Sequence, residues 1–511
     1  MLGTSYYHCD DDARAFQNGV KLSSICVDSI LVNGYGKYRN HTNPSDSFPS
    51  IKQIYNVTRQ ASRVKLRIMH AGFEYPIRLF RLDGMSLLIT AADGGDILPV
   101  EVTDLIVGIG ETVDVELLLP ENMENFNIRV QLLVQCKGKQ CDPIYSPHVD
   151  IGIQRSDLIE ISPARLLFEE PTVPINQVAS CSPQNDGRCS IFNCPWKNWS
   201  IKSKNAESSE KKCKFINEAR RNTTQDHKFH IKPPMSDEKP DKIFNVTLNF
   251  SHGSAINNMR FKYPKVPLYH DPVSWEFVEC PEMGDVPPEG IQCTQVLTAE
   301  VGELIELRLV GTEHPDSWRR KLRTYHTVHL HSHDFYLMSM GFPQLFDNGT
   351  IAGLNENLHC VNSACTVHEW NEEALQEALQ NQRDDHIAKN TLMLPSQGYA
   401  IVRFRATNPG YWPLHCHNLM HAVEGMMLLF HIKDSVQNRP FSMIPDGLPQ
   451  CLNHLPSVIY PWDITSPVNN EYENSIVSPD DLDHKYIQSS AASFNCCYSI
   501  SFFIFRSIIL N

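Results

Sequence analysis

The sequence His415-Cys416-His417-Asn-Leu-Met-His421-Ala-Val-Glu-Gly-Met426 places a cysteine between two histidines, with a further histidine five residues after the cysteine and a methionine ten residues after it. A second histidine cluster, His326-Thr-Val-His329-Leu-His331-Ser-His333, precedes it in the chain. Thiolate, imidazole and thioether groups at such close spacing are typical of a site for a redox-active metal ion. The two segments therefore predict a metal centre made from distant parts of the chain.

Four residues supply the donors of a blue copper site. A thiolate suits Cu⁺, imidazoles suit both Cu⁺ and Cu²⁺, and a weak axial thioether tunes the potential. Cys416, His421 and Met426 provide three of these donors from one short segment, and His326 provides the second imidazole. We therefore expect copper as the cofactor.

The histidines beside the cysteine point to a second metal centre. Alternate residues on an extended segment face opposite sides, so His415 and His417 face away from Cys416. On the other segment, His329 and His331 alternate in the same way. These four histidines are therefore expected to hold metal next to the first site.

Both segments resemble copper motifs of the multicopper oxidases, and within that family the animal laccase-like branch. The family's motifs read roughly H-P-x-H-L-H-G-H and H-C-H-x-x-x-H-x-x-x-x-M; here Thr327 replaces the usual proline and Ser332 the usual glycine. His333 matches a position that is not usually a ligand. The resemblance implies these ligands: His326, Cys416, His421 and axial Met426 for type 1 copper, His329 for type 2, and His331, His415 and His417 for type 3. Cys416, His415 and His417 would also carry electrons between the centres.

Half of the family's three-copper cluster has no counterpart in this sequence. The family takes those ligands from H-W-H and H-x-H motifs in the first of three domains, and no such pair occurs before Tyr325. No secretory signal follows Met1. We therefore predict that the chain comprises the second and third domains of a secreted, extracellular oxidase whose signal and first domain are absent from it.

Sequons and cysteines indicate an oxidising, glycosylating compartment. The chain holds 16 cysteines. It also has seven N-x-S/T sequons, at Asn40, Asn56, Asn198, Asn222, Asn245, Asn249 and Asn348. A short cytosolic product in which the sequons are accidental is the alternative.

Hydrophobic alternation predicts an all-β fold of tandem cupredoxin-like Greek-key β-sandwich domains. Residues 63–70, 75–82 and 114–119 alternate with period two between turn sequences, which is typical of a sandwich. Residues 1–168 resemble the family's second cupredoxin domain, which binds no copper of its own. Residues 241–436 form the predicted C-terminal cupredoxin-like domain with the type 1 copper motifs.

Strands are expected at 243–250, 296–309 and 399–405 in the C-terminal domain, where 296–309 holds two strands around a turn. A helix is expected at 372–380, as an insertion between the ligand strands. Disulfides are expected between Cys280 and Cys293 and between Cys360 and Cys365. Cys416 should stay free as a ligand.

Residues 169–240 form a polar linker or insertion that contains cysteines, namely Cys181, Cys189, Cys194 and Cys213. Their spacings match no C-x-x-C pair, so a disulfide-stapled segment is favoured over a zinc site. Residues 437–511 are predicted to be a disordered tail. The apolar end of this tail is shorter than the ~20 residues of a membrane-spanning helix, so no membrane role is expected.

The ligands and the resemblance together imply a copper-dependent oxidoreductase of the laccase type. A phenol or similar reductant would give electrons through His326 or His421, and dioxygen would accept them in the full-length parent. Glu74 and Asp93 are candidates for a carboxylate beside the ligand histidine, and an ordinary turn or surface acid is the alternative for each.

Two alternatives to a laccase stay open. One is a ferroxidase, with ferrous ion as the reductant, and the other is a non-catalytic copper-binding or structural relative. The net charge of −14 argues against a nucleic-acid partner.

Overall fold

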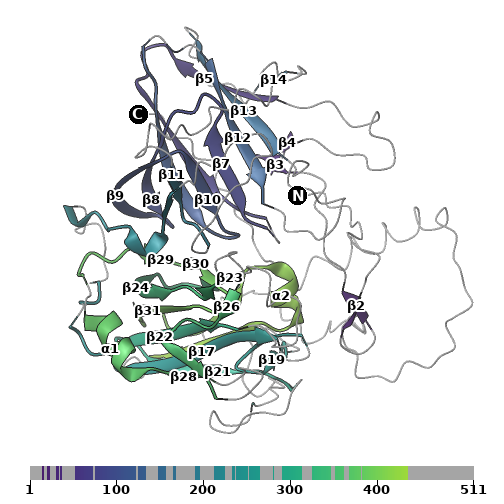
Figure 1. Cartoon of the computed structure of the whole chain (residues 1–511), viewed down its shortest axis with the longest axis vertical. Helices are drawn as coiled ribbons and strands as arrows, with labels where there is room; N and C mark the ends of the chain where they lie inside the picture. Colours follow the sequence, from purple (N-terminus) through teal and green to yellow (C-terminus); the bar gives the residue numbers. More distant parts are fainter. Residues whose placement is uncertain are drawn as a thin grey trace, which may run out of the picture. The chain divides into compact units, whose positions relative to one another are not determined.

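The computed structural model confirms the all-β prediction, with strands arranged mainly in four sheets (Figure 1). It describes residues 52–133, 148–156, 190–195, 212–224, 233–264, 291–312, 325–346, 351–361 and 368–434, apart from gaps of one or two residues. Short segments at 14–16, 20–22, 30–36 and 165–167 and the single residue Cys280 are also described. The predicted tail lies outside these residues from 435 onward.

Two sheets come from the N-terminal part of the chain. The larger sheet has the order β14 (Arg165–Leu167), β5 (Lys52–Thr58), β13 (His148–Ser156), β12 (Asn125–Leu132), β7 (Ile77–Arg81), β10 (Asp104–Val107), β15 (Ser190–Phe192) and β16 (Lys212–Lys214). The smaller has the order β6 (Arg63–Met69), β11 (Thr112–Leu118), β8 (Leu87–Ala92) and β9 (Gly95–Val102). The period-two segments predicted from the sequence correspond to β6, β7 and β11. We call these two sheets the first pair.

Apolar side chains from both sheets of the first pair form one core. Leu79, Leu105 and Ile128 come from the larger sheet, and Ile89 and Val115 from the smaller one; all are almost fully buried. Each such side chain contributes about 1.5–3 kcal/mol relative to an exposed one. The hydrophobic alternation of the sequence is thus the cause of the sandwich.

Part of the predicted 169–240 linker belongs to this architecture. β15 and β16 extend the larger sheet by parallel pairing, and the short 3-10 helix η6 (Ile216–Glu218) follows them. A disulfide joins Cys194 to Cys213. For these two cysteines, the predicted disulfide is thus confirmed in preference to a zinc site. Cys181 and Cys189 lie outside the described residues.

The second pair of sheets carries both ligand segments. One sheet has the order β18 (Ser254–Ile256), β17 (Lys242–Phe250), β22 (Leu304–Gly311), β31 (Tyr399–Arg405), β24 (Phe335–Gly341) and β29 (Ala388–Lys389). The other has the order β21 (Val296–Glu300), β33 (Met427–Lys433), β32 (Gly410–Cys416), β23 (Tyr325–Leu330) and β30 (Thr391–Pro395). The strands predicted at 243–250, 296–309 and 399–405 are confirmed as β17, β21 with β22, and β31.

Short two-stranded pairs and two helices complete the described part of the chain. The two-stranded pairs are β1 (Arg14–Phe16) with β2 (Val20–Leu22), β3 (Leu31–Val32) with β4 (Tyr35–Gly36), β19 (Arg260–Phe261) with β20 (Gln292–Cys293), β25 (Gln344–Leu345) with β26 (Ile351–Gly353), and β27 (Leu358–Cys360) with β28 (His368–Trp370). Helix α1 (Glu372–Gln380) has the predicted bounds, whereas α2 (Leu419–Glu424) was not predicted. None of the helices in the described residues is long and apolar enough to cross a membrane.

The cysteines follow the predicted pattern where the structure describes them. Cys280 and Cys293 form a disulfide, and Cys416 is a buried free cysteine. Cys360 is disulfide-bonded, and its predicted partner Cys365 lies outside the described residues. The one free thiol among the described residues therefore lies in the histidine-rich segment.

Candidate metal centre

The register between β23 and β32 distributes the predicted ligands over two faces of one sheet. Val328 pairs with Cys416, and His329 pairs with His415. Because side chains alternate along a strand, His326 shares the face of Val328 and Cys416. His329 and His415 point to the opposite face. Two adjacent strands thus present one set of donors on each side.

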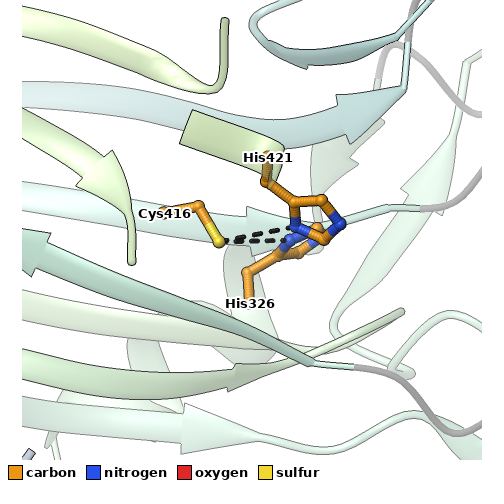
Figure 2. Close-up of side chains that lie close together, drawn as sticks. All are labelled: His326, Cys416 and His421. Atoms are coloured by element: carbon orange, nitrogen blue, oxygen red, sulfur yellow. Dashed lines mark hydrogen bonds between the residues drawn. The ribbon is translucent and has the colours of Figure 1, made fainter. Parts of the chain in front are cut away.

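On the first face, His326, Cys416 and His421 form a compact donor set (Figure 2). Sγ of Cys416 lies 3.5 Å from Nδ1 of His421 and 3.9 Å from Nδ1 of His326. A metal bound at about 2.3 Å to sulfur and about 2.0 Å to nitrogen holds these atoms about 3.5 Å apart. The three donor atoms therefore fit a single ion, and a soft thiolate with two imidazoles suits copper.

Helix α2 carries His421 back to the cysteine. The side chain of Asn418 caps the helix and accepts a hydrogen bond from the backbone N–H of His421. Gly425 ends it at φ 123°, where a Cβ would lie 2.8 Å from the backbone nitrogen of Phe261. The carbonyl of Met426, whose side chain is fully buried, then accepts from the N–H of Cys416. A short capped helix and a glycine thus place His421 and Met426 next to the thiol.

The two histidines of this set differ in exposure. His326 is only 1% exposed, whereas His421 is half-buried. The ring of Phe250 contacts both, with ring centroids 5.7 Å from His326 and 5.2 Å from His421. Leu419 and Val423, on α2 beside His421, are exposed. A molecule in solution can therefore approach the set through His421.

Four imidazoles gather on the opposite face. Ring centroids are 4.8 Å apart for His329 and His331, 5.2 Å for His331 and His415, and 5.7 Å for His415 and His417. Nε2 of His331 lies 3.1 Å from Nε2 of His415. Nδ1 of His415 is 2.9 Å from the carbonyl of Cys416, to which it donates its proton, so Nε2 of His415 carries a lone pair. We call these four residues the half-cluster.

Burial keeps the half-cluster uncharged at neutral pH. Burial and the neighbouring imidazoles lower the pKa of His329 to about 3. Burial also lowers the pKa of His415 to about 4, and the pKa values of His331 and His417 are lowered for the same reason. Metal ions bind the neutral form of imidazole, so these groups are ready to act as ligands.

The ring of His333 connects two segments of the chain by hydrogen bonds. Its Nε2 accepts hydrogen bonds from the backbone N–H groups of Thr407 and Asn408, at 3.2 and 3.3 Å. Ser332, where the motif usually has glycine, has φ 61°, and its hydroxyl accepts from the side chain of Asn408. His333 thus ties the first ligand segment to the loop before β32, as expected for a residue that is not a ligand.

Asp93 does not act as a substrate-facing carboxylate. Its side chain is 1% exposed and pairs with the buried Lys389. Asp93 lies in the turn after β8, as the alternative of an ordinary turn acid expects, but its side chain is buried and does not lie on the surface. Glu74 lies outside the described residues.

Gly110 packs directly against the half-cluster. At φ 81°, a Cβ added there would lie 2.5 Å from Cδ2 of His417. Gly110→Ala should lower the free energy of unfolding by roughly 2–4 kcal/mol, because it combines left-handed backbone strain with overpacking. Gly302→Ala is the control, since Gly302 has φ 99° and nothing within 4 Å. Urea unfolding of the metal-free chain measures both, and equal costs would contradict the packing of Gly110 on His417.

Several residues of the site were not identified from the sequence. Asn418 directly precedes a helical segment, so its capping role had a sequence signal. Phe250, Gly110 and Lys389 had none, because their roles depend on contacts with distant segments.

The chain matches models of one protein family. Residues 258–436 match a model described as multicopper oxidase, and residues 1–146 match a second model with the same description. Laccase-14 of Arabidopsis thaliana is 27% identical over 214 residues, which cover 39% of this chain and 32% of that protein. Putative laccase-9 of Oryza sativa subsp. japonica is 23% identical over 440 residues, which cover 80% of this chain and 65% of that protein.

Among solved structures, Fet3p, a multicopper oxidase that functions in iron import, aligns with a TM-score of 0.46 and 14% identity, over 75% of this chain and 58% of Fet3p. The chain spans between about a third and two thirds of the length of these two laccases. The thiolate and two imidazoles form a group that could hold a metal ion. Because both family models match, the chain belongs to the multicopper oxidase family, whose cofactor is copper.

Proposed function

We propose that this chain holds the electron-accepting half of a laccase-type oxidoreductase. The observation that carries the proposal is the buried donor set of Cys416, His326 and His421, with Sγ within 3.9 Å of both imidazole nitrogens. These residues would hold a type 1 copper, and Met426 would supply a further, weak thioether ligand. When bound, copper supplies one-electron redox chemistry at this site.

The reductant would approach His421. This imidazole is half-buried, and α2 also carries two exposed apolar side chains, Leu419 and Val423, two residues before and after it. His326 is buried and contacts Phe250, so it is closed to a reductant. A phenol or a similar aromatic reductant suits these apolar side chains. The carboxylate that α2 carries, Glu424, accepts from the N–H and the hydroxyl of Ser254 and is therefore already bound within the fold. The surface therefore favours the laccase reading over the ferroxidase one.

The chain itself links the two donor sets. Cys416 is joined directly to His415 by one peptide bond and to His417 by another. The backbone N–H of His417 donates to the carbonyl of Thr327 at 2.6 Å, which fixes this link to β23. His329 would hold a type 2 copper, and His331, His415 and His417 would hold the type 3 coppers. The half-cluster is therefore the destination that we propose for the electrons.

A second candidate function is an electron-accepting copper protein that does not reduce oxygen. It is favoured by the absence of H-W-H and H-x-H pairs before Tyr325 in this sequence. Such pairs supply the remaining cluster ligands in the family. The two candidates differ in turnover with dioxygen, which the parent enzyme would use as electron acceptor.

Oxygen uptake distinguishes the two candidates. We expect the copper-loaded chain to be blue, to bleach when a diphenol reduces it under argon, and to consume no oxygen above the rate of free copper. Absorbance and an oxygen electrode measure these properties. Sustained oxygen consumption that Cys416→Ser abolishes would show instead that this chain is a complete oxidase.

The proposal extends to the branch and the compartment. We assign the chain to the animal laccase-like branch on its ligand motifs, although the two relatives described above are plant laccases. Secretion and glycosylation are proposed from the sequons, of which Asn56 and Asn245 are exposed. Asn249 is 2% exposed and its side chain bonds Asn258, so this sequon is not available in the folded chain. The domains proposed from the sequence are 1–168, without copper of its own, and 241–436, and β15 and β16 add part of 169–240 to the first of them.

A further inference from the structure

A buried group of charges joins the first pair of sheets to the second. Lys389 in β29 has a fully buried side chain, and its Nζ lies 3.1 Å from Oδ2 of Asp93 and 3.1 Å from Oε1 of Glu111. The carboxylates of Asp93 and Glu111 are 1% and 0% exposed. Buried charges are rarely retained without partners, so this triad fixes the segment around Lys389.

Backbone and side-chain donors hold the two carboxylates in place. Oδ1 of Asp93 accepts from the N–H of Thr112 at 2.8 Å. Oε2 of Glu111 accepts from the N–H of Gly108 at 2.7 Å and from Nδ2 of Asn193 at 2.8 Å. Both carboxylates are therefore held in place by hydrogen bonds that do not involve Lys389.

Asp93 also binds the backbone where the chain passes from one sheet to the other. β29 ends at Lys389 in one sheet, and β30 begins at Thr391 in the second. Oδ2 of Asp93 accepts from the N–H groups of Asn390 and Thr391, both at 3.1 Å. A buried backbone donor left without an acceptor is costly, so the carboxylate determines the path of residues 389–391.

Residues 390 and 391 in turn hold His329. Nδ1 of His329 lies 2.9 Å from the carbonyl of Asn390 and 2.9 Å from Oγ1 of Thr391. The hydroxyl of Thr391 donates to Oδ1 of Asn390, so its oxygen accepts from His329. Nδ1 of His329 therefore carries the proton, and Nε2 keeps the lone pair that a metal requires.

We propose that Asp93, paired with Lys389, is a positioning residue for His329: it holds residues 390 and 391 so that their oxygens fix the ring and tautomer of this metal ligand. The proposal rests on the function proposed above, in which His329 holds type 2 copper. In this proposal the first pair of sheets, which is proposed to bind no copper of its own, helps to build the copper centre. Outer partners of ligating histidines usually control metal affinity in this way.

Asp93→Asn tests the proposal in the full chain. The amide keeps the shape of the side chain but places N–H donors against the N–H groups of residues 390 and 391 and removes the charge facing Lys389. Cu²⁺ titration followed by electron paramagnetic resonance separates the blue copper from a second, non-blue copper at the half-cluster. We expect the affinity for the non-blue copper to fall about 10- to 100-fold, while the blue signal is unchanged.

Asp150→Asn is the matched control. Asp150 pairs with Arg129 at 2.7 and 2.8 Å, and their side chains are 10% and 9% exposed, against 1% for Asp93, so the control removes a charge from another largely buried ion pair. This pair lies within the larger sheet of the first pair, between β12 and β13. The control should lower stability and leave both copper signals as in the wild type. If Asp93→Asn alone does not fold, a variant with Asp93→Asn, Glu111→Gln and Lys389→Met removes all three charges of the triad together.

A crystal structure of the metal-free variant gives a second measurement that does not depend on copper. We expect the contact between Nδ1 of His329 and the carbonyl of Asn390, 2.9 Å in the wild type, to be lost. If the wild type binds no second copper, the function proposed for the half-cluster fails, and the crystal structure still tests the positioning. An unmoved His329 ring, or an unchanged affinity for the second copper, would overturn the proposal.

Discussion

Cys416→Ser is expected to leave the copper-loaded chain colourless. The thiolate is the soft ligand of the predicted type 1 site, and a serine hydroxyl neither ionises at neutral pH nor donates charge to copper as a thiolate does. The affinity for copper at this site should fall by more than the roughly 10- to 100-fold that loss of an outer partner costs. Visible absorbance and equilibrium dialysis measure the two effects.

Met426→Leu is the control for this substitution. Its side chain is fully buried, its backbone carbonyl accepts from the N–H of Cys416, and leucine fills a similar volume. The blue colour should remain, and the reduction potential should rise because a weak donor that stabilises Cu²⁺ is lost. A Cys416→Ser protein that stayed blue would show that another residue supplies the sulfur ligand.

Acid is expected to destabilise the metal-free chain by several kcal/mol between pH 7 and pH 5. Burial lowers the pKa of His70, His368 and His386 to about 4, against 6.5 when exposed. The unfolded chain therefore binds more protons below pH 6.5, so stability present above that pH is lost as the pH falls towards 4. Each group contributes about 2 kcal/mol at pH 5. Glu111, whose pKa burial raises, acts in the opposite direction.

Urea unfolding at the two pH values tests this dependence. His70 is suited to substitution, because its Nε2 donates to the carbonyl of Tyr75 and its Nδ1 accepts from the N–H of Gly72, at 2.7 and 3.2 Å. His70→Gln should reduce the loss of stability between pH 7 and pH 5 by about 2 kcal/mol. His359→Gln, at a histidine whose side chain is 59% exposed, is the control. An equal loss in wild type and His70→Gln would exclude His70 from the acid response.

Much of the sandwich architecture could be predicted because alternation along a strand is a local property. Residues 243–250 and 399–405 alternate clearly and form β17 and β31. β15 and β16 could not be predicted, since they are three residues long and lie in a polar stretch. Their place in the sheet depends on parallel pairing and on the disulfide between Cys194 and Cys213.

For the site, too, features that depend on neighbouring residues could be predicted, and features that depend on distant segments could not. Spacing alone predicted that Cys416 faces away from His415, and the register of β32 agrees. The difference in exposure between His326 and His421 could not be predicted, because it depends on how α2 and Phe250 pack. Lys389 reads as a surface lysine in the sequence, and its acidic partners lie far earlier in the chain. Burial of a charge depends on tertiary structure, which no local pattern encodes.

The most direct test of the copper assignment is a crystal structure of the copper-loaded chain with anomalous data collected on both sides of the copper absorption edge. We predict an anomalous peak bonded to Sγ of Cys416 and to the Nδ1 atoms of His326 and His421, which lie 3.9 and 3.5 Å from this sulfur in the present structure. Copper found only at other residues, with these three side chains unligated, would contradict the account.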